Sequence, residues 1–334
     1  MKIERVLFAA AVTIAFAFSS APAMAQSSAA ASPSAQSTSL KQFLGRWDLT
    51  LRAPDREWPS WIEIEEQNGQ VSAQFVSRWG NARPLPKIEI HGNHISFVSP
   101  KEEEDRKDDM AFEGRLSGKT LSGTTTGQDG TQWTWTGVRA PGLARTHSRV
   151  NETTMSHYWG KPSRLFNGKD LTGWKMSRPG PPNWTVQDGN LVSPGNGPEI
   201  ISDRRFQDFS LHIEFNCGRD SNSGVYLRGR YEVQIETESA GEPPSHHTGG
   251  VYGFLAPAPE LPRAPDVWQT FDITLIGRRV TVVQNGTTIV DNQEIPGITG
   301  GALDSHEALP GPIYLQGGEK GHVAFRNIVL TPAQ

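Results

Sequence analysis

The stretch Phe209-Ser210-Leu211-His212-Ile213-Glu214-Phe215 alternates apolar and polar side chains at every position. Because successive side chains of a β-strand point to opposite faces, this alternation predicts a strand with one buried and one polar face. The same period recurs downstream, where Phe271, Ile273 and Leu275 alternate with polar residues. The two segments predict that the second half of the chain is built from antiparallel sheets.

The turns between the alternating segments point to the same architecture. Asn285-Gly286 lies between an apolar run that ends at Val283 and another that begins at Thr288. Asn-Gly in such a position is the strongest short signal for a β-hairpin. Further strand-like segments close the chain, and long helical patterns are absent from the sequence. We therefore predict an all-β half with two packed antiparallel sheets, as in a jelly roll.

A smaller all-β domain is predicted at residues 40–138. Its alternating segments include Trp61-Ile62-Glu63-Ile64-Glu65 and Lys87-Ile88-Glu89-Ile90-His91, and turn signals such as Asn68-Gly69 separate them. Strands at this regular spacing predict an antiparallel meander or barrel. Six of the ten tryptophans lie here, at positions 47, 58, 61, 79, 133 and 135. Their rings could stack on sugars, but we expect most of them to form the core.

The first 25 residues have the three-part pattern of a secretory signal peptide. Lys2 and Arg5 are positive, an apolar run ends at Phe18, and Ala23-Met24-Ala25 is a small-residue cleavage site. We therefore expect a periplasmic or secreted protein whose mature chain begins at Gln26. No later stretch of the sequence is apolar over the length that a membrane span needs.

The composition of two segments predicts where the domains begin and end. Residues 26–39 are rich in Ser, Ala and Gln, which predicts a flexible tether, and residues 139–161 read as a linker to a second domain at 162–334. The formal net charge of −4 argues against nucleic acid as a partner.

Cys217 is the only cysteine, so an internal disulfide is impossible, and we expect a buried thiol rather than a nucleophile.

The residues best suited to chemistry lie in one predicted hairpin. A three-residue loop at Arg228-Gly229-Arg230 pairs Leu227 with Tyr231 and gathers the apolar side chains on one face. The opposite face then holds Tyr226, Glu232, Gln234 and Glu236, with Arg228 at its rim. Carboxylates, an amide and a phenol on one surface can supply a base and hydrogen-bond partners. A solvated outer face carries the same residue types, so the pattern alone leaves both interpretations open.

The loop that follows holds His246, His247 and Tyr252 among several glycines. Loops on a rigid sandwich commonly carry function. Two adjacent histidines in extended backbone point apart, which disfavours one metal bound by both. We expect one of them to act as an acid, a base or a hydrogen-bond partner of the substrate. No cofactor is required by the pattern, and the need for a divalent metal stays open.

The second half of the chain contains a series of short motifs whose order resembles that of a known family. They are Leu165-Phe166-Asn167-Gly168-Lys169-Asp170-Leu171-Thr172-Gly173-Trp174, Asn222-Ser223-Gly224-Val225, Arg228, Tyr231-Glu232-Val233-Gln234-Ile235, Thr248-Gly249-Gly250-Val251-Tyr252, Asn285-Gly286 and Phe325-Arg326-Asn327-Ile328. In this order they resemble the 3-keto-disaccharide hydrolase family, which implies a concanavalin-like jelly roll. The likeness runs from about Arg164 to Leu330 and leaves the role of the first domain open.

The resemblance implies cleavage of a glycoside whose sugar is already oxidised at C3. A C3 ketone acidifies the C2 proton, so a base can remove it while the C1 substituent leaves, and water then adds to the enone. We expect Glu232 to be the base, with Glu236 or His247 as alternates, and Tyr252 or a histidine to assist departure. The substrate-binding candidates are Arg228, Gln234, Asn222, His246, Gln316 and Arg326.

Two other functions fit the same residues. A lectin-like module would bind carbohydrate without cutting it. An ordinary glycoside hydrolase would use Glu232 together with a second carboxylate. If the substrate is a 3-keto-sugar, a sugar 3-dehydrogenase must act upstream to supply it.

Overall fold

A computed structural model describes most of the chain. The described residues are 40–76, 81–103, 107–127, 130–142, 159–180, 183–195, 197–237, 241–262, 264–318 and 321–334. They form strands and two short 3₁₀ turns, η1 (Lys101–Glu103) and η2 (Pro244–His246). The predicted signal peptide and tether, and most of the predicted linker, lie outside these residues. None of the described helices has the length and the apolar character needed to cross a membrane.

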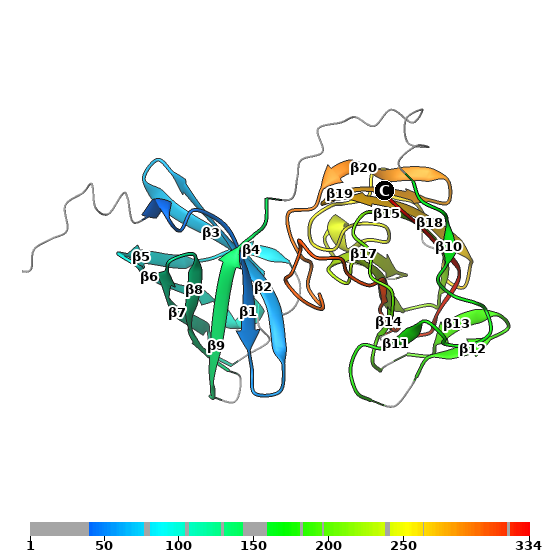
Figure 1. Cartoon of the computed structure of the whole chain (residues 1–334), viewed down its shortest axis with the longest axis horizontal. Coiled ribbons are helices and arrows are strands. Elements are labelled where there is room, and N and C mark those ends of the chain that lie inside the picture. Colours follow the sequence, from blue (N-terminus) through cyan, green and yellow to red (C-terminus); the bar gives the residue numbers. More distant parts are fainter. Residues whose placement is uncertain are drawn as a thin grey trace, which may run out of the picture.

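The N-terminal part is one curled antiparallel sheet (Figure 1). Its strands are β1 (Gly45–Arg52), β2 (Glu57–Gln67), β3 (Gln70–Val76), β4 (Ala82–Pro84), β5 (Lys87–His91), β6 (His94–Ser99), β7 (Met110–Ser117), β8 (Thr120–Thr126) and β9 (Gln132–Arg139). Chain neighbours pair with one another except β4 and β5, and β1 also pairs with β9. The order β4-β3-β2-β1-β9-β8-β7-β6-β5 therefore leaves the edges at β4 and β5. The predicted meander or barrel is thus an almost closed meander.

Aromatic residues fill the inside of this curled sheet. Phe97 and Phe112 stack with ring centroids 4.4 Å apart, and Trp135 meets both rings edge-on. Trp47, Trp133 and Trp135 are buried in the same core. The preference for core over exposed sugar platforms is therefore confirmed for these three, whereas Trp79 lies outside the described residues.

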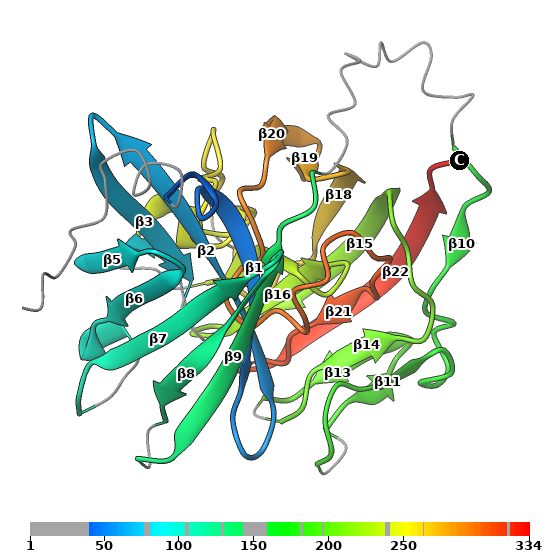
Figure 2. The same ribbon diagram turned by 60° about the vertical axis from the view of Figure 1, so that its left-hand side comes forward.

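The C-terminal part is a sandwich of two antiparallel sheets (Figure 2). The larger sheet contains β10 (Ser163–Arg164), β12 (Thr185–Gln187), β13 (Asn190–Ser193), β15 (Phe209–Cys217), β18 (Gln269–Ile276), β19 (Arg279–Gln284), β20 (Thr287–Glu294) and β22 (Val323–Pro332). The smaller sheet contains β11 (Trp174–Met176), β14 (Ile200–Ser202), β16 (Asn222–Leu227), β17 (Tyr231–Glu236) and β21 (Tyr314–Leu315). The predicted all-β sandwich is confirmed.

The alternating stretch from Phe209 to Phe215 lies in β15, at the centre of the larger sheet. Its apolar residues are fully buried, and the Phe215 ring lies 4.5 Å from the ring of Phe271 on β18. The predicted Asn-Gly turn joins β19 to β20, and Asn285 and Gly286 both have positive φ, at 49° and 80°. A two-residue turn with this geometry matches the twist of the paired strands. The strand and the turn that the sequence predicts thus both belong to the larger sheet.

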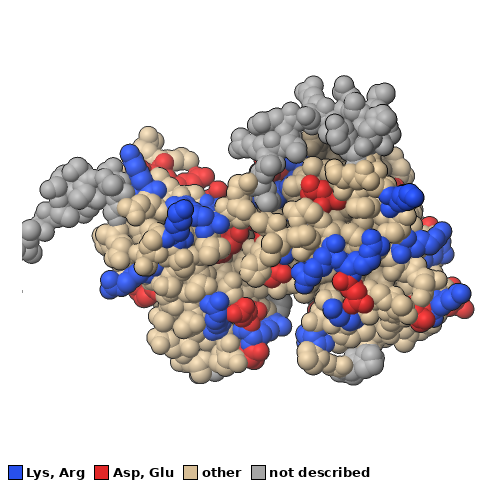
Figure 3. Space-filling model, in the orientation of Figure 1, with Lys and Arg blue, Asp and Glu red and all other residues tan. Residues whose placement is uncertain are grey.

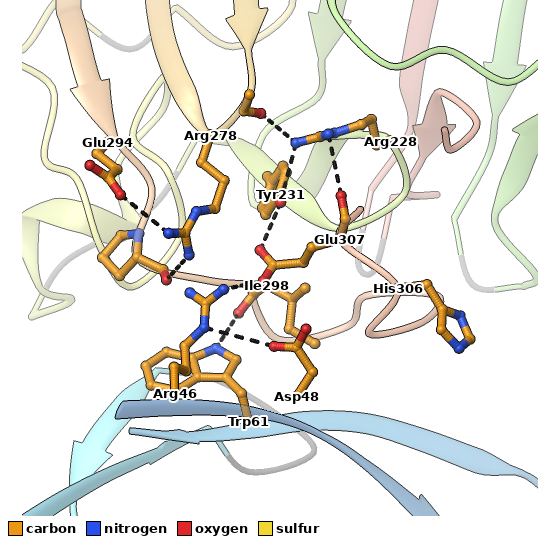
Figure 4. A network of polar contacts seen from close by, with 12 residues as sticks. Arg46, Asp48, Trp61, Arg228, Tyr231, Arg278, Glu294, Ile298, His306 and Glu307 are labelled. Atoms are coloured by element: carbon orange, nitrogen blue, oxygen red, sulfur yellow. Dashed lines mark hydrogen bonds and ion pairs between the residues drawn. The ribbon is translucent and has the colours of Figure 1, made fainter. Parts of the chain in front are cut away.

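The two parts of the chain are joined by a buried interface (Figure 4). Trp61 points out of β2 into the sandwich core, is 1% exposed, and donates its indole N–H to the Ile298 carbonyl at 3.1 Å. Arg46 on β1 forms a buried ion pair with Glu307. Glu307 also accepts a hydrogen bond from the Tyr231 hydroxyl at 2.7 Å. These buried contacts join the first two strands of the N-terminal sheet to the sandwich.

Candidate active site

A cavity of about 460 Å³ opens on the outer face of the smaller sheet. The strands β16, β17 and β21 supply its floor, and loops supply its walls. It is lined by Arg178, Gly197, Glu199, Asn222, Tyr226, Glu232, Gln234, Tyr252, Gly300, Gly301, Tyr314, Gln316, Gly317 and Gly318. Small-molecule sites have volumes of roughly 300–1,000 Å³. The volume and the mostly polar lining suit a sugar-sized ligand.

The hairpin β16–β17 has the register that the sequence predicts. Leu227 pairs with Tyr231 and Val225 with Val233. The apolar face packs into the sandwich core, and the opposite face turns Tyr226, Glu232 and Gln234 toward the cavity. Glu232 is only 4% exposed, so this surface is not a solvated outer face. A buried carboxylate beside a cavity is the arrangement expected of a functional group.

The Glu232 carboxylate is oriented by its neighbours. The Tyr226 hydroxyl lies 2.9 Å from Glu232 Oε2 and 3.0 Å from the Gly300 carbonyl oxygen, and its single proton can be donated to one of them at a time. On the neighbouring strand, Gly224 leaves the space that the carboxylate occupies, because a Cβ at that position would overlap it. The backbone thus fixes where the carboxylate stands.

Two tyrosines form one wall as a stacked pair. The rings of Tyr226 and Tyr314 lie 4.2 Å apart and are nearly parallel, at 14°. Burial raises the pKa of Tyr226 well above its usual value, and the nearby Glu232 carboxylate raises it further. Burial, Glu199 and Glu232 likewise raise the pKa of Tyr314. Both phenols therefore stay protonated at neutral pH and act as hydrogen-bond donors.

The loop with the two histidines adds backbone to the edge of β17. The Gly249 amide donates to the Gln234 carbonyl at 2.8 Å, and the Tyr252 amide donates to the Glu232 carbonyl at 3.0 Å. This pairing carries Tyr252 into the cavity. Its ring stacks on His246 at 4.1 Å, so the histidine supports the tyrosine from behind.

Amide side chains occupy the other side of the floor. Gln234 Nε2 lies 3.4 Å from Asn222 Oδ1, and Gln316 follows β21. The backbone N–H of Gln316 donates to the Gly224 carbonyl at 3.0 Å, which ties its loop to β16. Five of the ten candidates from the sequence meet in the cavity, namely Asn222, Glu232, Gln234, Tyr252 and Gln316.

Other candidates lie outside the cavity. The position of Arg228 differs most from the one that the sequence predicts. It has a positive φ of 54°, is fully buried, and donates to the Gly277 carbonyl and to the Tyr231 hydroxyl. The prediction that it stands at the rim of the polar face was wrong, because the tight turn directs it to the opposite side of the hairpin. Arg326 pairs with Glu214 at 2.7 Å and lies over the Trp268 ring. Both residues therefore lie away from the cavity.

Glu236 and the histidines also lie outside the set that lines the cavity. Glu236 is 6% exposed, and its backbone is bonded to the Thr248 hydroxyl. His247 Nδ1 lies 3.0 Å from a Glu260 carboxylate oxygen. His246 Nδ1 and Nε2 each lie 2.8 Å from an oxygen, of Glu242 and of Asn81 respectively. The adjacent histidine rings do point to different partners, as their spacing predicted.

Apart from glycines, three cavity residues were not singled out from the sequence at all, namely Arg178, Glu199 and Tyr314. Tyr314 lies between Ile313 and Leu315, so the alternation could have placed it on the polar face. Arg178 and Glu199 come from loops and carry no such signal. Glu199 accepts a hydrogen bond from the Ser177 hydroxyl at 2.7 Å and lies 3.6 Å from Arg178 Nε. They add a second carboxylate and a guanidinium to the site.

Among the described residues, no group of three or more His, Cys, Asp or Glu side chains is arranged to hold a metal ion. Cys217 is 1% exposed, and burial raises the pKa of its thiol to about 11. The thiol is therefore protonated and inert, as a buried core cysteine should be.

The profile of the 3-keto-alpha-glucoside-1,2-lyase-like domain matches residues 161–331, just over half of the chain. The chain belongs to this family. A curated relative, the 3-keto-disaccharide hydrolase of Bacteroides thetaiotaomicron, is 27% identical over a 73-residue match that covers 19% of this chain. The chain spans about a quarter of that relative's length. Membership in the family supports a carbohydrate-active function.

Two crystal structures from Parabacteroides distasonis, both provisionally described as glycosyl hydrolases, are also similar. One is 29% identical, covers 51% of this chain and 82% of its own, and has a TM-score of 0.43. The other is 21% identical, covers 55% of this chain and 98% of its own, and has the same TM-score.

Proposed function

We propose that the protein cleaves 3-keto-glycosides by elimination at C1 followed by addition of water. The observation that carries this proposal is the buried Glu232 carboxylate, which faces a polar cavity and is held by the neutral Tyr226 phenol. A positioned carboxylate is a suitable base for a carbon acid whose proton is acidified by a neighbouring ketone.

In the first step Glu232 takes the C2 proton and becomes a carboxylic acid. The electrons of the C2–H bond delocalise onto the C3 oxygen as an enolate. When the enolate collapses, the C1–O bond to the leaving group breaks and a C1=C2 double bond conjugated to the C3 ketone forms. Water then adds, with hydroxyl at C1 and a proton at C2, so that one glycosidic bond and one water are consumed.

The remaining side chains of the cavity can serve this sequence. The Arg178 guanidinium and the Gln234 and Asn222 amides supply donors for the C3 oxygen as negative charge develops. Arg178 takes the place of Arg228, the arginine that the sequence offered as a substrate-binding residue, because Arg178 is the arginine that lines the cavity. Tyr252 can donate a proton to the departing oxygen.

One observation favours a second function. Glu199 and Glu232 line the same cavity, and paired carboxylates are the machinery of an ordinary glycoside hydrolase. Such an enzyme would cleave a disaccharide without a C3 ketone, whereas a lectin-like module would bind either sugar and cleave neither.

A pair of substrates in D2O separates these functions. A 3-keto-disaccharide and its unoxidised parent are incubated with the protein, and the products are examined by mass spectrometry and NMR. We expect cleavage of the 3-keto-disaccharide alone, with deuterium at C2 beyond the exchange in an enzyme-free control. Cleavage of the parent at a comparable rate would favour the two-carboxylate hydrolase, and binding of either sugar without cleavage would favour the lectin.

We further propose that the protein acts in the periplasm or outside the cell, on a product of an upstream sugar 3-dehydrogenase. The N-terminal pattern of positive, apolar and small residues supports export. Sequencing of the N-terminus of the protein from cells should find Gln26 first, and retention of Met1 on the protein would reject export by this signal.

A further inference from the structure

A second cavity of about 380 Å³ lies between the N-terminal sheet and the sandwich. The start of β2 supplies one side through Arg56, Glu57, Trp58 and Pro59. The opposite side includes Ala302 and Leu303. Four residues line both this cavity and the candidate active site, namely Arg178, Glu199, Gly301 and Tyr314. The two cavities are therefore neighbours that share a wall.

The lining of the second cavity has the character of a sugar-binding surface. Trp58 and Pro59 offer apolar surface, and the Arg56 guanidinium carbon lies 3.3 Å from the centre of the Trp58 ring. Glu57 adds a carboxylate that also pairs with Arg52 at 2.9 Å. Aromatic surface next to charged hydrogen-bonding groups suits a ring with apolar C–H faces and hydroxyl edges.

The N-terminal sheet holds this wall in a fixed place. Trp61 lies three residues along β2 from Trp58 and is anchored in the sandwich core. Arg46 on the paired strand is tied to Glu307 (Figure 4). Burial raises the pKa of the Tyr314 phenol, and the positive charge of the nearby Arg56 acts in the opposite direction. The start of β2 thus acts on a residue of the active site.

We propose that this second cavity binds the sugar or other group attached at C1 of the substrate, so that the N-terminal sheet supplies the leaving-group subsite. The proposal rests on the proposed cleavage of 3-keto-glycosides, in which the oxidised ring occupies the cavity with Glu232. The C1 substituent then extends past Tyr314 and Gly301 toward Trp58. This gives the N-terminal sheet a part in substrate recognition.

The test compares two substrates that differ only beyond C1. A 3-keto-disaccharide reaches the second cavity, whereas methyl 3-keto-glucoside has no group to place there. In Arg56→Ala and in Trp58→Ala, the ratio of kcat/KM for the disaccharide to kcat/KM for the methyl glycoside should fall about fivefold or more, mainly through KM. Arg115→Ala, which removes an exposed arginine of β7 outside both cavities, should leave the ratio at its wild-type value.

The outcomes separate this inference from the proposed function. If the wild-type protein cleaves neither substrate, the proposed function fails and the inference fails with it. If it cleaves both and Arg56→Ala leaves the ratio at the wild-type value, the leaving-group subsite is wrong while the proposed function stands. Arg56 is exposed, so this variant remains informative even if Trp58→Ala, which also loses packing in the N-terminal core, does not fold.

Discussion

Glu232 owes its position to a glycine on the next strand. Gly224 pairs with Gln234 across the hairpin, and the Glu232 side chain lies over the space that a Cβ at position 224 would fill. Because the clash is with the end of a flexible side chain, a methyl group there would displace the carboxylate and spare the fold. The sequence places Glu232 and Gln234 on one face by alternation, but it gives no sign that Gly224 makes room for the carboxylate.

Gly224→Ala should therefore cost activity rather than stability. We expect kcat on a 3-keto-disaccharide to fall at least about tenfold, with the midpoint of thermal unfolding changed by only a few degrees. Gly142→Ala is the matched control, because a Cβ there meets no atom within 4 Å. Wild-type turnover in Gly224→Ala would show that the carboxylate need not stand where it does.

The hairpin β16–β17 carries two tyrosines with different tasks on its two faces. Tyr226 faces the cavity and bonds Glu232, whereas Tyr231 faces inward and bonds Glu307 at 2.7 Å. Alternation predicted this division, since the turn length and the apolar pattern allow one register. It could not predict where Arg228 points, because that depends on a positive φ inside the turn. Nor could it predict Arg178 or Glu199, whose loops meet the hairpin only in the folded protein.

The two faces can be tested with a matched pair of substitutions. Tyr226→Phe should lower kcat about tenfold and change stability little, since it removes the donor that orients the base. Tyr231→Phe should lower the free energy of unfolding by about 1–3 kcal/mol and leave most activity, because it removes a partner of the buried Glu307. Stability is measured by chemical denaturation and activity by steady-state kinetics. A loss of stability in Tyr226→Phe together with a loss of activity in Tyr231→Phe would contradict this division of tasks.

At the scale of the whole molecule, the sequence predicts two domains joined by a linker but gives no sign of how they meet. Figure 3 shows positive and negative side chains interspersed over both parts. The contact depends on Trp61 with Ile298 and on Arg46 with Glu307, and in each pair the two residues are more than 200 positions apart in the chain. Both loops that the N-terminal sheet touches, near Phe254 and Ile298, also carry residues of the active site. Local patterns along the chain contain no information on such a contact.

The interface should also make stability depend on pH. Burial, and then repulsion by Glu307, raises the pKa of Asp48 to about 7 from 3.8. Between these values the folded state holds a proton that the unfolded chain has released, so stability falls as the pH rises from about 4 to 7. Asp48→Asn should flatten this fall and make the protein more stable than wild type at pH 8. An unchanged pH dependence of the denaturation midpoint would contradict the raised pKa.

The central claim, that Glu232 is the base, is tested most directly by turnover of a 3-keto-disaccharide in Glu232→Gln. The amide keeps the size of the side chain but cannot accept the C2 proton. We predict a loss of about a hundredfold or more in kcat, with KM and the circular dichroism spectrum close to wild type. A folded Glu232→Gln protein that turns over the 3-keto-disaccharide at nearly the wild-type rate would contradict the account.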